Sequence, residues 1–164
     1  MAVKNGVSLN WGGFDKALGK AAHKLGDTQA LMESVGEALV SGTKKRFAAK
    51  KDPEGKPWQP SRRALEEGGE TLTDSGRLRR SIDYAATSDK VMVGSNLAYA
   101  RIHQKGGEIR PKKARKLVFK DSDGKTVAVD KVTIPARPYL GVSKEDLEDV
   151  KATMADFLAG AFKA

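Results

Sequence analysis

Hydrophobic side chains recur every three or four residues in three stretches of the chain, and this spacing predicts three amphipathic helices. The first covers residues 14–25. The second begins at Asp27 or Thr28, either of which can cap it, and extends to Lys50. The third follows Ser143 as its N-cap, with acidic side chains in the first turn, where they suit the helix dipole. The expected buried stripe of the second helix comprises Leu31, Val35, Ala38, Leu39, Gly42 and Phe47, and that of the third Leu147, Val150, Met154, Phe157, Leu158 and Ala161.

Between the second and third helices the pattern changes to alternating apolar and polar residues. Residues 81–87 predict one strand and the neighbourhood of Val91 another, joined by the short connection 88–90. A short helix over 97–104, capped by Asn96, follows and ends at two glycines.

The next segment carries the signal of a hairpin. Residues 117–120 and 126–132 predict two strands around the turn 121–124, which has the expected Asp-Gly chemistry. Beyond them, 135–138 contains two prolines that fix φ and predict a stiff, extended segment. The order of elements predicts an α+β fold, in which a small, mainly antiparallel sheet is flanked by N-terminal, central and C-terminal helices.

A chain of 164 residues suits a single domain. We divide it into a helical part (1–50), a long loop (51–73), a sheet with an inserted helix and hairpin (74–142), and a C-terminal helix (143–164). Three prolines and several charges make the loop a connection of roughly 20 residues, a length that is usually functional or mobile. Within it, Trp58 either pins the loop onto the body or packs on a neighbouring subunit.

Composition narrows the possible partners and excludes some chemistry. The formal net charge is +9 and cysteine is absent, which favours acidic partners and rules out disulfides and thiolate sites. No apolar stretch approaches the roughly 20 residues that cross a bilayer, and the first residues lack the apolar core of a signal peptide. We therefore expect no membrane association and no export by an ordinary signal.

The sequence offers little for catalysis or for metal binding. Of the two histidines, His23 is expected at the surface, and His103 is better explained as a structural residue tied to backbone than as a base. The turn at 121–124 starts like a calcium loop, but Lys125, Thr126 and Val132 occupy positions that need an oxygen ligand, glycine and glutamate. We expect no enzyme, no catalytic or metal-binding residue and no cofactor.

Two clusters of cations remain as candidate binding sites. One lies at the end of the second helix, where a solvated end that suits the helix dipole is the simpler explanation: Lys44, Lys45, Arg46, Lys50 and Lys51. The other could follow a phosphate backbone without sequence preference, or could face another subunit: Arg110, Lys112, Lys113, Arg115 and Lys116.

Four phrases in a fixed order carry a family resemblance. They are DPEGKPWQP (52–60), LTDSGRLRRSI (72–82), VGSNLAYARIHQKGG (93–107) and IPARPYLGVS (134–143). Together they resemble the phage virion morphogenesis family, which contains the tail completion and neck proteins of Mu-like and P2-like tailed phages. The resemblance runs from about residue 52 to residue 158.

This resemblance implies a structural virion protein of a phage or prophage, assembled in the host cytoplasm and located at the head–tail junction. It implies tail completion, neck formation and head–tail joining by a homo-oligomer, expected to be a hexameric ring around the DNA channel. Expected partners are the neighbouring neck proteins (connector or head-closure protein, tail terminator, tail tube), with possible non-specific contact with channel DNA. The alternative function is a basic, non-sequence-specific nucleic-acid-binding protein.

Ring closure requires two different patches on each subunit. Candidates for these contacts are Trp58, Arg79, Arg80, His103, Arg137 and Tyr139.

Overall fold

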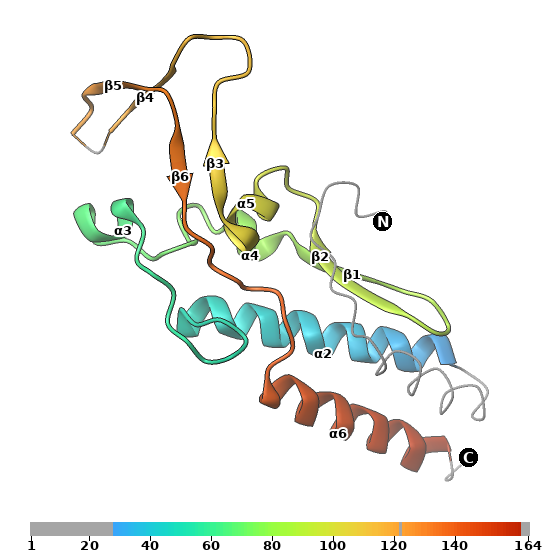
Figure 1. Ribbon diagram of the computed structural model, residues 1–164. Helices are drawn as coiled ribbons and strands as arrows, with labels where there is room; N and C mark the ends of the chain where they lie inside the picture. The colour runs from blue at the N-terminus through green and yellow to red at the C-terminus, as the bar shows by residue number, and fades with distance from the viewer. Residues whose placement is uncertain (1–27, 122, 162–164) are drawn as a thin grey trace.

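The computed structural model describes residues 28–121 and 123–161 and confirms an α+β fold (Figure 1). The predicted helix over 14–25 lies outside the described residues. The helices are α2 (Thr28–Ala49), α3 (Arg62–Glu66), α4 (Arg77–Arg80), α5 (Ala100–Lys105) and α6 (Lys144–Ala161). The strands are β1 (Ile82–Ala86), β2 (Val91–Ser95), β3 (Gly107–Ile109), β4 (Leu117–Lys120), β5 (Thr126–Val129) and β6 (Val132–Ile134).

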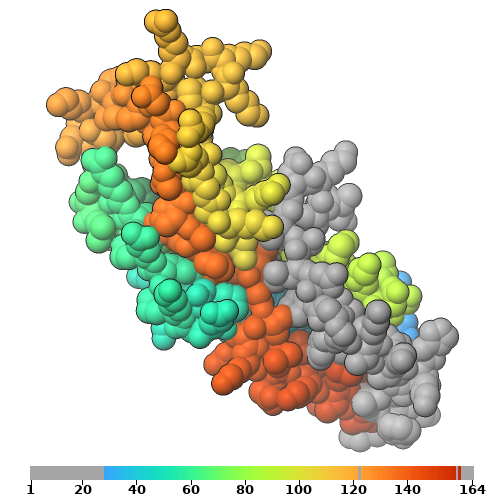
Figure 2. Space-filling model, in the orientation of Figure 1, coloured from blue at the N-terminus to red at the C-terminus, as the bar shows by residue number. Residues whose placement is uncertain are grey.

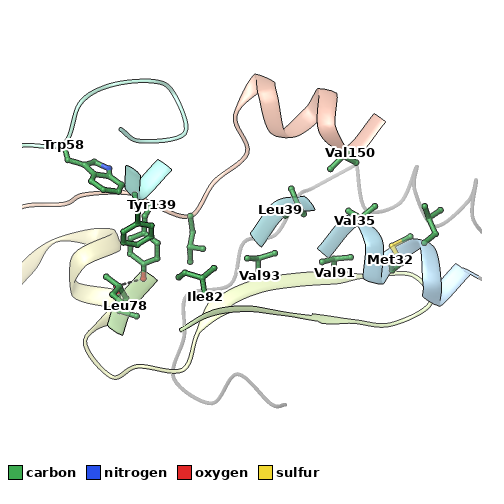
Figure 3. Packing of buried hydrophobic residues seen from close by; sticks show 14 residues of the cluster. Met32, Val35, Leu39, Trp58, Leu78, Ile82, Val91, Val93, Tyr139 and Val150 are labelled. Atoms are coloured by element: carbon green, nitrogen blue, oxygen red, sulfur yellow. Dashed lines mark hydrogen bonds between the residues drawn. The ribbon is translucent and has the colours of Figure 1, made fainter. Parts of the chain in front are cut away.

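Helix α2 is the centre of the body, with α6 on one side and the β1–β2 hairpin on the other (Figures 1 and 3). Its predicted stripe is buried, because Leu31, Val35 and Leu39 are each at most 3% exposed. Val150 of α6 and Val93 of β2 pack on opposite sides of this stripe. The helical periodicity of the sequence therefore located the core correctly.

Helix α6 begins as predicted, at a reciprocal cap. The Asp146 backbone N–H donates to Ser143 Oγ (3.1 Å), and the Ser143 N–H donates to Asp146 Oδ2 (2.7 Å). Arg46, however, was expected at a solvated helix end and is buried instead, with its guanidinium paired to Asp146. The packing of α6 against α2 places the carboxylate there and removes both groups from water.

The strands form three separate two-stranded antiparallel ladders. The predicted pairs β1–β2 and β4–β5 are present. The strand predicted over 126–132 is interrupted after Val129, since the chain changes partner there and β6 pairs with β3. The β3–β6 ladder, with Ile109 opposite Val132, was not predicted, because three residues are too few to show a period.

Ladders β3–β6 and β4–β5, covering 107–134, form an arm that projects from the body (Figures 1 and 2). No described residue within 107–134 is fully buried. Among the described elements, no helix packs extensively against the strands of this arm. Nor does any helix in the described part of the chain have the length and apolar character to cross a membrane.

Two local predictions were incomplete. The loop 51–73 contains a turn in which Asp52 Oδ1 accepts two backbone N–H bonds, and it contains α3, capped by Ser61. Helix α5 begins at Ala100 rather than after Asn96, and it has no side-chain cap. The predicted cap is wrong because the hydroxyl of Ser95, and not Asn96, accepts the backbone N–H that follows the strand.

Candidate functional site

The segments of the four sequence phrases meet where the arm joins the body. The extended residues 135–139 lie between the loop and α5. Trp58 donates from Nε1 to the Pro138 carbonyl (2.8 Å), and Arg137 donates from Nε to the Gln59 carbonyl (2.6 Å). The Arg137 backbone N–H donates to the His103 carbonyl (2.8 Å). We call this region the junction.

Tyr139 anchors the junction in the core. Its side chain is fully buried, its ring packs against Phe47 with centroids 5.3 Å apart, and its hydroxyl donates to the Ala100 carbonyl (3.0 Å; Figure 3). Burial raises the pKa of this hydroxyl. Phe47 also packs edge-on against Trp58 at 5.5 Å, so the loop is held on its own subunit. For Trp58, this is the first of the two alternatives that the sequence left open.

Gln104 of α5 clamps the extended segment in the way that a neighbouring strand would. Its Oε1 accepts the backbone N–H groups of Tyr139 (2.9 Å) and Leu140 (3.0 Å), and its Nε2 donates to the Leu140 carbonyl (2.8 Å). Among the described residues, the extended segment has no neighbouring strand at this point. The Gln104 side chain alone therefore satisfies two of its backbone N–H groups and one of its carbonyls. Gln104 lies inside the third phrase, but sequence analysis did not single it out.

A pocket of about 300 Å³ opens at the junction, between the loop, α4 and α5. We call it the junction pocket. Three guanidinium groups belong to its lining, against one carboxylate, that of Asp74. Its polar lining includes Arg63, Thr73, Arg77, Tyr99, His103 and Arg137.

Arg137 carries the most unusual charge of the pocket. It is 6% exposed, and Nε and Nη2 donate only to the carbonyls of Gln59 and Pro60. No carboxylate of the described residues lies within ion-pair distance of its guanidinium. Burial without a counterion lowers the pKa of this group.

His103 is half-buried beside this charge, with its ring edge-on to Tyr99 at 5.9 Å. Burial, and secondly the charge of Arg137, lower its pKa, so the imidazole is neutral at neutral pH. Within the described structure, His103 Nδ1 and Thr73 Oγ1 are buried and have no hydrogen-bond partner. The expected tie of this histidine to backbone is therefore not made by Nδ1, and the bond from the Arg137 N–H to the His103 carbonyl does not involve the ring.

Of the six predicted contact residues, the structure brings four together at the junction and leaves two on the surface of α4. Trp58, His103, Arg137 and Tyr139 converge, whereas Arg79 and Arg80 are exposed. Sequence analysis missed the contributions of Arg63, Thr73, Arg77 and Gln104. For Thr73 and Arg77, the signal available was their position inside the second phrase.

The basic cluster 110–116 lies in the loop of the arm, away from the body. Arg110 pairs with Glu108 (2.8 Å), and hydrogen bonds from Lys131 and Arg110 lower the pKa of that carboxyl group. The other cations of the loop are exposed and have no ion-pair partner among the described residues: Lys112, Lys113, Arg115 and Lys116. Such side chains can contact any acidic surface.

The described residues contain no group of three or more His, Cys, Asp or Glu side chains that could hold a metal ion. At the hairpin tip, Asp121 Oδ1 accepts the backbone N–H groups of Asp123 (3.1 Å) and Lys125 (2.8 Å), so the carboxylate supports the turn.

Comparison with known proteins adds a family. The model of the phage virion morphogenesis family matches residues 9–159. A protein of Escherichia phage Mu named for capsid assembly, protein G, is 30% identical over 133 residues, which is 74% of each chain. The FluMu G protein 2 of a Mu-like prophage in Haemophilus influenzae is 28% identical over 141 residues, 86% of each chain. No solved structure matches the chain.

Proposed function

Because the chain belongs to the phage virion morphogenesis family, with a role in building a phage particle, we propose that it is a structural subunit of the head–tail junction. In this role it completes the tail, forms part of the neck and joins head to tail. It is assembled in the host cytoplasm and resides in the virion. Binding, and not catalysis, is its function.

The observation that carries this proposal is the projecting arm. An isolated two-stranded ladder is at best marginally stable in water, so a second surface must cover it. Alternation places Leu117 and Phe119 of β4, with Val127 and Val129 of β5, on one apolar face of the hairpin. Phe119 remains 42% exposed. We infer that this face packs on a neighbouring copy.

An arm that fits a different patch on the next copy gives a heterologous contact, and repetition of such a contact closes a ring. Charge supports the same arrangement, since the arm carries the cations of 112–116, which are exposed and unpaired within the described structure. Helix α6 exposes acidic side chains at Glu148, Asp149 and Asp156, of which the first two also pair with Lys151 and Lys45. We propose a hexameric ring that contacts the connector or head-closure protein on one side and the tail terminator or tail tube on the other.

A single substitution tests the arm. Phe119→Ser is expected to convert an oligomer of several 17.6-kDa subunits into the monomer. Sedimentation measures the mass, first for the chain by itself and then for the chain mixed with tail tubes of the same phage. The unfolding temperature of the monomer should hardly change, because the Phe119 side chain is already 42% exposed within the subunit. Lys120→Ser, on the opposite face of the same strand, is the matched control and should assemble normally. A parent protein that stays monomeric in both settings would refute the ring.

The exposed cations of 110–116 favour a second candidate function, a basic protein that binds nucleic acid without sequence preference. This candidate predicts tight duplex binding by the isolated monomer. Its affinity should fall with salt, at a slope of about −0.9 for each phosphate contacted. If the chain binds nucleic acid in this way, deletion of 112–116 should flatten that slope. If the chain is a structural subunit, the same deletion should weaken ring assembly or genome retention. Binding that is absent or insensitive to salt excludes the nucleic-acid candidate.

A further inference from the structure

The structure contains two deeply buried arginines with opposite electrostatic environments. Arg46 is 7% exposed, and its charge is balanced by the buried carboxylate of Asp146. Arg137 is 6% exposed, and only carbonyl oxygens accept its hydrogen bonds among the residues that the structure describes. Leaving one buried charge without its partner is strongly destabilising. A subunit that retains such a charge is incomplete at this point.

The surroundings of Arg137 are prepared for an anion. Arg63 donates from Nη2 to the carbonyls of Glu70 (2.6 Å) and Thr73 (3.2 Å), which fixes a second guanidinium in the lining. Arg77 adds a third that is exposed and has no ion pair within the described residues. Asp74 is the one carboxylate of the lining, but its side chain is 82% exposed and lies 3.9 Å from Arg63. It leaves Arg137 uncompensated.

Polar atoms at the same place also lack partners. Thr73 and His103 both line the pocket, and each has a buried polar side-chain atom without a hydrogen bond in the described structure. Such atoms normally find partners, and their coincidence with an unbalanced guanidinium indicates a missing ligand. A planar, bidentate acceptor is the group that arginine recognises best.

We propose that the junction pocket binds a carboxylate side chain of a partner protein, with Arg137 and Arg77 as its guanidinium contacts. A protein side chain fits better than duplex DNA, because Arg137 is recessed and a phosphate backbone is contacted by long, exposed cations such as those of 110–116. This site goes beyond the proposed function, and it stands whether or not the subunits close into a ring.

Acetate is the simplest probe of this pocket. Titration of the isotope-labelled chain with sodium acetate, at ionic strength held constant with chloride, should shift the amide resonances of Thr73, Tyr99 and His103 together. Arg137→Gln should weaken acetate binding about 10-fold or more, the worth of a charge-assisted bond. Arg77→Gln serves if that variant fails to fold, because its side chain is exposed. Arg110→Gln, in the arm, is the matched control and should leave acetate binding unchanged.

Absent shifts, shifts spread over the surface cations, or binding of inorganic phosphate without acetate would overturn the proposal. A separate measurement, the self-association of the chain, shows which protein supplies the carboxylate. If acetate dissociates the oligomer and Arg77→Gln does the same, the carboxylate comes from a second copy. If acetate binds and the oligomer is unaffected, the carboxylate comes from another virion protein. A monomeric chain that binds acetate would refute the ring and retain this site.

Discussion

Asp146→Asn would remove the counterion of the buried Arg46. In the parent, the guanidinium also donates to Thr43 Oγ1 (2.8 Å) and to the carbonyls of Tyr139 (3.0 Å) and Gly141 (3.0 Å). These three acceptors are neutral, so they solvate the charge without balancing it. The substituted amide keeps the size of the side chain and an oxygen for the cap, and the change therefore isolates the charge.

Removing one partner of a buried ion pair costs about 3–5 kcal/mol. That is a large share of the ~5–15 kcal/mol that stabilises a typical domain. At about 2–4 °C per kcal/mol for a chain of this size, the unfolding temperature should fall by about 6–20 °C. Arg46 lies on α2 and Asp146 on α6, so both helices should be destabilised together.

Urea and thermal unfolding followed by circular dichroism measure this loss. Asp149→Asn is the matched control, one turn further along α6, where the carboxylate pairs with Lys45 at 3.4 Å. Those side chains are 48% and 71% exposed, and their separation should cost less than about 0.5 kcal/mol. If Asp146→Asn cost as little as Asp149→Asn, the buried pair would contribute no more than a surface pair, and the reasoning would be wrong.

Three further substitutions and titrations test other contacts. Gly36→Ala should make the chain unfold at lower urea, since a Cβ there would lie 2.6 Å from Tyr84 Cγ. Overpacking costs about 1–3 kcal/mol, which outweighs the gain in helix propensity of up to about 1 kcal/mol. A more stable variant would contradict this. The pKa of His103, followed by NMR, should lie below about 6.5, so that its contribution to stability is constant at higher pH and is lost as pH falls below that value; Arg137→Gln should raise this pKa. Trp58→Phe should lose about 1 kcal/mol in urea unfolding through the missing indole N–H bond, and an unchanged midpoint would argue against that bond.

The parts of the fold that sequence could predict are those whose signal is local. Helices α2 and α6 repeat their apolar stripes over several turns, and the cap at Ser143 is built from residues three apart. The β1–β2 and β4–β5 hairpins join alternating strands through short turns. In each case the interacting residues are close in sequence, so the pattern itself contains the contact.

The parts that could not be predicted depend on residues far apart in the chain. The burial of Arg46 requires a carboxylate 100 residues away, and the clamp by Gln104 joins it to a segment more than 30 residues later. The β3–β6 ladder is too short to show alternation. For the site, the phrases offered Arg137 and His103 as subunit-contact candidates, which stays a prediction, and only the fold shows that they line one pocket.

The junction also determines the direction of the arm, because both connections between arm and body pass through it. Strand β3 follows α5 through Gly106, whose φ of 69° is favourable for glycine, and a Cβ there would lie 2.7 Å from the Ala136 backbone nitrogen. Strand β6 leads directly into the segment that carries Arg137. A carboxylate bound to Arg137 would hold that segment against the loop, and so would stiffen the base from which the arm extends. The two proposals are therefore linked: occupation of the pocket by one partner would orient the surface offered to another, which is the property that ordered assembly requires.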